Sequence, residues 1–281
     1  MSEEKDIEQS QQDVNNESSK LNEESLTTND NTQTKSMEVH HHPDLHHKKK
    51  RFKEYFLEFL MLFLAVTLGF FAEQIREGFT DRRREEAYMN SMIQDLKVDT
   101  ASLSSNIRLR QQREEMIDSL ILLLSSPDVK ENGNAIYFFG RSISPPMYFF
   151  PDDRTIQQLK STGSLRLVSN MQISNSIMDY DRKMRQQIFE YTDEQEVRGE
   201  SRQIAIKIFD GKVFNEMIRN NGIDRPVNIP QLFTYDVTLI NEYIVQTQYL
   251  RKVNQLQVMR AKELFTQAKQ LMGLIKKEYH L

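Results

Sequence analysis

The sequence contains no cysteine and no tryptophan among its 281 residues. The lack of cysteine excludes disulfide bonds, thiolate metal sites and cysteine nucleophiles. It does not identify the compartment, because a bacterial periplasmic protein needs no disulfide. Without tryptophan, any aromatic belt around a membrane span must consist of tyrosine and phenylalanine.

Glycine and proline are also scarce, with nine and seven residues in the whole chain. Leucine, glutamine, glutamate, lysine and arginine are plentiful, and this composition favours long helices over a turn-rich β fold. We therefore predict an all-α fold with a disordered N-terminal tail, one transmembrane helix and a soluble domain that is an elongated helical bundle or coiled coil. Polar residues within the apolar stripes argue against a perfect heptad seam and favour the bundle.

Motifs of common catalytic and nucleotide-binding sites are missing, including GxGxxG, GxxxxGKS/T, HExxH, GxSxG and CxxC. His280 is the only histidine outside residues 40–47, which excludes a serine–histidine or metal–histidine site in the soluble part. Three carboxylate pairs remain formal candidates for catalysis, although such pairs are common on solvated helix faces: Asp152–Asp153, Asp179–Asp181 and Glu194–Glu196. We expect no enzymatic activity, and we assign no catalytic, cofactor-binding or metal-binding residue and no cofactor.

The net charge of −4 is the sum of two unlike parts. Residues 1–47 hold eleven acidic and three basic residues, whereas the remainder holds thirty acidic and thirty-four basic residues. The nearly balanced soluble part has no concentrated basic face of the kind that binds a phosphate backbone, so we expect no nucleic-acid partner.

Residues 1–47 are predicted to be a disordered acidic tail, because they contain too few aliphatic residues to offset the entropy of ordering. The alternative is a tail that orders on a partner. The tail ends in HHHPDLHH, residues 40–47, whose imidazoles are potential zinc, copper or nickel ligands. Because no fixed surroundings orient these rings, we interpret the segment as a polar linker, with metal binding as the alternative.

Residues 55–72, YFLEFLMLFLAVTLGFFA, are predicted to be a transmembrane helix. Eighteen residues at about 1.5 Å each span roughly 27 Å, which is close to the hydrocarbon thickness of a bilayer. All faces of this helix are apolar, whereas a core helix of a soluble protein normally keeps a polar stripe. The span thus implies the lipid bilayer as a partner.

The orientation of the span is predicted from its basic flanks. The juxtamembrane segment 48–54 contains KKKRFK, with five basic residues, against four arginines between residues 76 and 84 on the other side. Cytoplasmic flanks carry the excess of lysine and arginine. We therefore expect a single-pass protein of the bacterial cytoplasmic membrane, with its N-terminus in the cytoplasm and its C-terminal domain in the periplasm. The reverse topology is the alternative.

The remaining chain is predicted to be mostly helical. Residues 73–127 form a helical stem with an amphipathic stripe, and residues 128–152 form a loop rich in aromatic residues and proline. Residues 153–281 form the helical bundle region. A short helix is predicted to begin after Asp153 and to end at Gly163. The next helix is predicted to begin at a capping box of Ser169 with Gln172, and the last helix at Asp236.

Two stretches resemble a known family. EYFLEFLMLFLAVTLGFFAEQIRE followed by DRRREEAYMNSMIQDLKVD is similar to the N-terminal signature of an uncharacterised family of single-span membrane proteins from Bacteroidetes-type bacteria. TIQQLKSTGSLRLVSNMQISNSIMDYDRKM is similar to the second recurring block of that family. The resemblance covers about a third of the chain, excludes the acidic tail, and implies a membrane-anchored helical protein without a known active site.

These features predict a membrane-anchored helical interaction or scaffold protein whose partner is another copy of the chain or another membrane protein. The alternative is a periplasmic sensor, or ligand-binding domain, that acts through a partner, since no output domain fits in the 54 residues before the span. The sequence identifies no small-molecule ligand.

Overall fold

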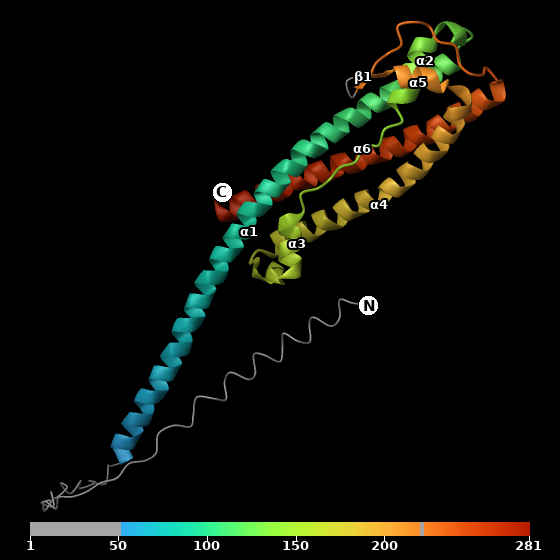
Figure 1. The fold of residues 1–281 in the computed structure, drawn as a ribbon. Coiled ribbons are helices and arrows are strands. Elements are labelled where there is room, and N and C mark those ends of the chain that lie inside the picture. Colours follow the sequence, from blue (N-terminus) through green and yellow to red (C-terminus); the bar gives the residue numbers. More distant parts are fainter. Residues whose placement is uncertain (1–51, 220–221) are drawn as a thin grey trace, which may run out of the picture. The chain divides into compact units, whose positions relative to one another are not determined.

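The computed structural model describes residues 52–219 and 222–281 and confirms an all-α protein (Figure 1). Helices make up 81% of the described residues. The elements follow in the order α1 (Phe52–Leu124), η1 (Val129–Glu131), α2 (Gly133–Ser142), α3 (Arg154–Ser161), η2 (Ser164–Leu167), α4 (Met171–Ile208), α5 (Gly211–Glu216), β1 (Ile218–Arg219), β2 (Gly222–Ile223) and α6 (Val237–Tyr279). The predicted tail, residues 1–47, and residues 48–51 of the basic segment lie outside the described residues.

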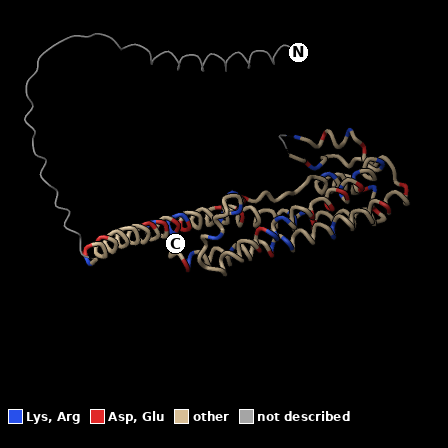
Figure 2. The backbone as a smooth tube through the Cα atoms, turned by 90° about the horizontal axis from the view of Figure 1, so that it is seen from below, with Lys and Arg blue, Asp and Glu red and all other residues tan. Residues whose placement is uncertain are grey.

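Helix α1 begins with the apolar stretch predicted to span a membrane. This helix is 73 residues long because no proline interrupts it. It contains a stretch long and apolar enough to cross a membrane, and none of that stretch is buried. In Figure 2 this stretch separates charged residues at the start of α1 from the charged residues that follow it. The chain divides into two units, Met1–Met61 and Leu62–Leu281, and the helical domain described below belongs to the second.

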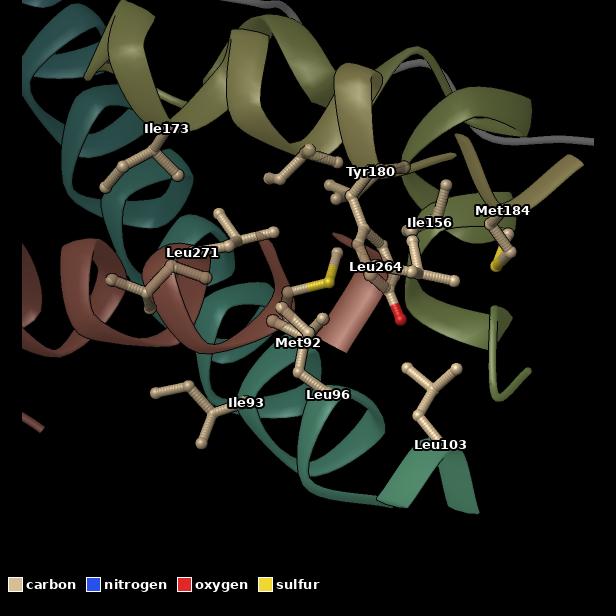
Figure 3. Close-up of a cluster of buried hydrophobic side chains, with 14 of the residues drawn as sticks. Met92, Ile93, Leu96, Leu103, Ile156, Ile173, Tyr180, Met184, Leu264 and Leu271 are labelled. Atoms are coloured by element: carbon tan, nitrogen blue, oxygen red, sulfur yellow. The ribbon is translucent and has the colours of Figure 1, made fainter. Parts of the chain in front are cut away.

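A first apolar core joins α1, α3, α4 and α6 (Figure 3). Met92 and Leu96 on α1 face Tyr180 on α4 and Leu264 on α6. Apolar residues recur at steps of three and four on each helix, and this spacing gives each helix one buried stripe. The predicted stripe of the stem is thus confirmed for residues 92–103.

A second apolar core is formed by the C-terminal parts of α1 and α4 and the N-terminal part of α6. Ile117 and Leu120 of α1 belong to it, together with Ile208 at the end of α4 and Tyr243 near the start of α6. Helix α2 adds Ile136 and Tyr137, and Ile143 follows directly after its last residue. Each long helix therefore contributes to both cores.

The predicted aromatic loop, residues 128–152, is wrong in part, because residues 133–142 form α2. The glycines that suggested a loop have packing roles instead. A Cβ on Gly133 would lie 1.9 Å from the carbonyl oxygen of Pro230, and a Cβ on Gly140 would lie 2.6 Å from the ring of Phe209. Both glycines allow α2 to approach the rest of the domain closely. Residues 145–153 are not helical, as expected.

The helix ends agree with most of the predicted caps. Asp236 accepts a hydrogen bond from the backbone N–H of Leu239, and Gly163 adopts a left-handed φ of 66° after α3. The capping box of Ser169 is wrong, because Asn170 caps α4 and Ser169 instead hydrogen-bonds to Glu85. Asp153 precedes α3 without a capping hydrogen bond.

Candidate functional site

A layer of buried polar side chains separates the two apolar cores. On α1 it lies between Leu103 and Ile117, on α4 between Tyr191 and Ile204, and on α6 between Leu250 and Val258. Its members are Asn106, Arg110, Arg113, Glu194, Arg198, Ser201, Asn254 and Gln257. Such residues cost free energy to bury, so their arrangement needs an explanation beyond packing.

Three arginines converge on the carboxylate of Glu194. Arg110 donates to one oxygen over 2.8 Å, and Arg113 donates to the other over 2.9 Å. The guanidinium of Arg198 lies 3.7 Å from the same carboxylate, within ion-pair range but beyond a hydrogen bond. Because one negative charge faces three positive charges, this buried cluster has an excess of positive charge.

The segment after α2 is attached to the cluster through its backbone. The Arg110 guanidinium donates to the carbonyl oxygen of Met147, and the Arg113 guanidinium donates to that of Pro145. Asn106 donates to the carbonyl oxygen of Tyr148 over 3.3 Å. These bonds satisfy carbonyl groups of a non-helical, partly buried segment that has no helical partners for them.

Helix α6 completes the cluster through Asn254. Its side-chain oxygen accepts a hydrogen bond from Arg110 over 3.3 Å, and its amide donates to the Arg110 carbonyl oxygen over 2.9 Å. The Arg110 guanidinium also lies 5.7 Å from the centre of the Tyr191 ring, a distance typical of a cation–π contact. The three long helices are therefore joined at one polar layer.

Burial lowers the pKa of Arg113 to about 10, and repulsion from Arg110 and Arg198 acts in the same direction. The attraction of Glu194 opposes this shift. The guanidinium still carries its charge at neutral pH, because its pKa stays well above 7. Arg113 thus adds a positive charge to the cluster at physiological pH.

A pocket of about 240 Å³ lies beside the cluster and shares Arg198 with it. Helix α2 contributes Arg141, helix α4 contributes Arg198 and Arg202, and the aromatic side chains of Phe209, Phe214 and Tyr243 form part of the wall. Of the described residues that line the pocket, none is acidic. The pocket therefore combines three guanidinium groups with an apolar wall.

The arginines of this pocket keep hydrogen-bonding capacity. Arg198 is 4% exposed, and its Nε and Nη1 have no hydrogen-bond acceptor in the described part of the chain. The Nε of Arg141 is also without an acceptor there, although its guanidinium lies 5.4 Å from the centre of the Phe214 ring. Buried donors of this kind usually have a partner.

The carboxylate pairs considered as catalytic candidates do not act as pairs. Glu194 is buried in the arginine cluster, whereas Glu196 is exposed. Asp181 is buried against Lys160 and Arg185, whereas its proposed partner is exposed and pairs with Arg182.

The third pair is also divided between separate partners. Asp152 forms an ion pair with Arg154, and Asp153 accepts a hydrogen bond from Gln157. The two acidic groups of each pair thus differ in burial or in their partners.

The arginine cluster was not predicted from the sequence. The signal was present, because Arg110 and Arg113 continue the stripe of Leu103 at helical steps and lead to Ile117. A charged residue on a buried stripe predicts a polar contact in the core. Which residues supply that contact depends on helices far apart in the sequence.

Residues 52–219 and 222–281 contain no group of three histidine, aspartate or glutamate side chains suited to a metal ion. The histidines of residues 40–47 lie outside this part of the chain. Comparison with protein-family models, with curated proteins and with solved structures finds no match for the chain. The resemblance to a single-span Bacteroidetes-type family therefore stays a prediction.

Proposed function

We propose that this protein is a membrane-anchored helical interaction protein without catalytic activity. The observation that carries the proposal is helix α1, which contains an unburied apolar stretch of membrane-spanning length and continues into the two apolar cores of the helical domain. An apolar surface of this size on all faces of a helix is costly in water and stable in lipid. The helical bundle on this anchor presents long helix faces to a partner.

The anchor is proposed to lie in the bacterial cytoplasmic membrane, with the tail in the cytoplasm and the bundle in the periplasm. The support is the basic flank of Lys48, Lys49, Lys50, Arg51 and Lys53, which outnumbers the arginines on the far side. The partner is accordingly a second copy of the chain or another membrane protein.

Membrane fractionation and crosslinking test this proposal with the full-length chain. We expect the chain to stay with the membrane pellet after extraction at alkaline pH, and a reporter fused to Leu281 to be active in the periplasm. Crosslinking in membranes should repeatedly capture the chain with itself or with one membrane protein. Release into the soluble fraction would refute the anchor, and repeated failure to capture any partner would refute the interaction role.

A second candidate function is a ligand-binding sensor domain that acts through a partner. The specific observation in its favour is the arginine-lined pocket beside the polar layer. A ligand there would contact α2 and α4 at the level where all three long helices meet. This candidate predicts a saturable small-molecule ligand, whereas a pure scaffold does not.

A further inference from the structure

The pocket shared by α2, α4 and α6 has a buried cation with unused donors. The Arg198 side chain is 5% exposed, and its nearest anionic group, Glu194, lies 3.7 Å away. Both oxygens of that carboxylate already accept shorter hydrogen bonds from Arg110 and Arg113. Arg198 therefore shares an acceptor that two other arginines already occupy.

The remaining contacts of Arg198 are weak. Its Nη2 lies 3.5 Å from the hydroxyl of Tyr148, which is at the limit for a hydrogen bond. Its Nε and Nη1 have no acceptor among the described residues. A carboxylate bound beside Arg198 in the pocket would supply the negative charge that the cluster lacks.

Two further arginines strengthen the preference for an anion. Arg141 is half-buried and Arg202 is exposed, and both line the same pocket. Guanidinium groups bind carboxylates through paired donors, and their attraction is strongest where the site excludes water. A neutral or cationic ligand would leave this excess of positive charge unbalanced.

The rest of the pocket is apolar and small. Phe209, Phe214 and Tyr243 form an aromatic wall, with Ile143 and Leu250 among the aliphatic lining residues. A volume of about 240 Å³ is below the roughly 300–1,000 Å³ of sites for drug-sized ligands and above the roughly 150 Å³ cavity that holds benzene. An inorganic anion would leave this wall without contacts.

We propose that this pocket binds a small organic anion in which one carboxylate is joined to an apolar body of about the size of a benzene ring. The carboxylate pairs with Arg198 and the arginines at the mouth of the pocket, and the apolar body packs against Phe209, Phe214 and Tyr243. This inference rests on the second candidate function and names its ligand class.

Titration of the purified full-length protein in a nonionic detergent tests the inference with benzoate, hexanoate and indole-3-acetate as probes. We expect saturable binding of at least one probe with a Kd of about 1 mM or lower, by calorimetry and by a rise in Tm. Benzyl alcohol lacks the charge, and acetate and phosphate lack the apolar body, so each should bind at least about tenfold more weakly.

The variant Arg141→Gln/Arg202→Gln removes two charges at the mouth of the pocket without changing the buried cluster. We expect at least about tenfold weaker binding of the best probe. The matched control is Lys207→Gln, which removes one charge from the exposed face of α4 and should bind as the wild type does. Arg198→Gln should abolish binding, and circular dichroism will establish that each variant is folded.

Three results would overturn the inference: no probe binds, benzyl alcohol or phosphate binds as well as the carboxylates, or the Arg141→Gln/Arg202→Gln variant binds like the wild type. Any of these results leaves the anchored interaction protein standing, because its test is membrane retention and crosslinking. Conversely, if the protein binds a probe but no partner is captured by crosslinking, only the interaction role is refuted and the ligand site stands.

Discussion

A single carboxylate, that of Glu194, faces three guanidinium groups in the interior of the helical domain. Taking several charges out of water is costly, and the attraction between them offsets that cost only when the set is complete. The hydrogen bonds of Arg110 and Arg113 to backbone carbonyls show that the cluster also holds the segment after α2 in place. The cluster therefore connects the segment after α2 to α1 and α4.

The variant Glu194→Gln should lower the free energy of unfolding by about 3–5 kcal/mol, because it leaves three buried cations without a counter-charge. Chemical denaturation followed by circular dichroism measures the change. The control is Glu196→Gln, the same substitution at an exposed position of the same helix, which should change stability by less than about 0.5 kcal/mol. Equal effects of the two variants would contradict the role given to Glu194.

Asp99 gives the fold a dependence on pH. Burial raises its pKa, although hydrogen bonds from the Tyr180 hydroxyl over 2.6 Å and from the Asp152 backbone N–H over 2.7 Å act in the opposite direction. Because the folded pKa is raised, the folded state holds the proton more tightly than the unfolded chain does. The stability that Asp99 contributes is fully present below its ordinary value of 3.8 and is lost as pH rises through the raised pKa.

The stability difference between the wild type and Asp99→Asn should therefore decrease as pH rises from below 3.8 through that raised pKa. Denaturation at a series of pH values measures this difference. The control is Asp179→Asn, at an exposed position. Its stability difference from the wild type should not show this decrease with pH. A difference for Asp99→Asn that stays constant or increases with pH would contradict the raised pKa.

Single elements of this fold differ in how far their sequence determines them. Helices α1, α4 and α6 follow from long runs without proline and from apolar residues at helical spacing, and α6 begins directly after the predicted cap, Asp236. Helix α2 was not predicted, because its glycines and neighbouring prolines have the composition of a loop. The contact of Gly133 with Pro230, which explains the first of those glycines, joins residues 97 positions apart.

Gly133→Ala should destabilise the domain by about 1–3 kcal/mol, because the new Cβ would lie 1.9 Å from the carbonyl oxygen of Pro230 and the backbone would have to shift. The matched substitution Gly199→Ala, within α4, meets no atom within 4 Å and should stabilise the protein by about 0.5–1 kcal/mol. Thermal denaturation compares the two variants. Changes of the same sign would contradict the close approach of α2.

At the scale of the whole molecule, the proposed orientation of the helical domain depends on the charges that flank the apolar stretch of α1. Five basic residues precede the predicted span and four arginines follow it, so the asymmetry that sets the orientation is small. A small asymmetry makes the orientation sensitive to substitution. The proposed orientation rests on the sequence alone, because the rule depends on charges near the predicted span and not on the fold.

Replacing Lys48, Lys49, Lys50, Arg51 and Lys53 by glutamine should invert the topology in a large fraction of the chains, because the excess of positive charge then lies on the other side. A reporter fused to Leu281 measures the fraction in each compartment. Replacing Arg82, Arg83 and Arg84 by glutamine should leave the domain in the periplasm. A wild-type reporter active in the cytoplasm would contradict the proposed orientation.

The sequence by itself determined the all-α class, the three long helices and the apolar stretch at the start of α1, because each depends on local composition and periodicity. The ends of α3 and α6 were also predictable, because Gly163 and Asp236 act on residues next to them.

Only the tertiary structure decided which polar side chains meet. Glu194 pairs with Arg110 on α1 and with Arg198 on its own helix, α4. The pocket joins α2 to α4 and α6. Helical periodicity places a residue on a buried face but does not say which other face it meets. That choice depends on how three helices pack around two cores, which is a property of the folded chain as a whole.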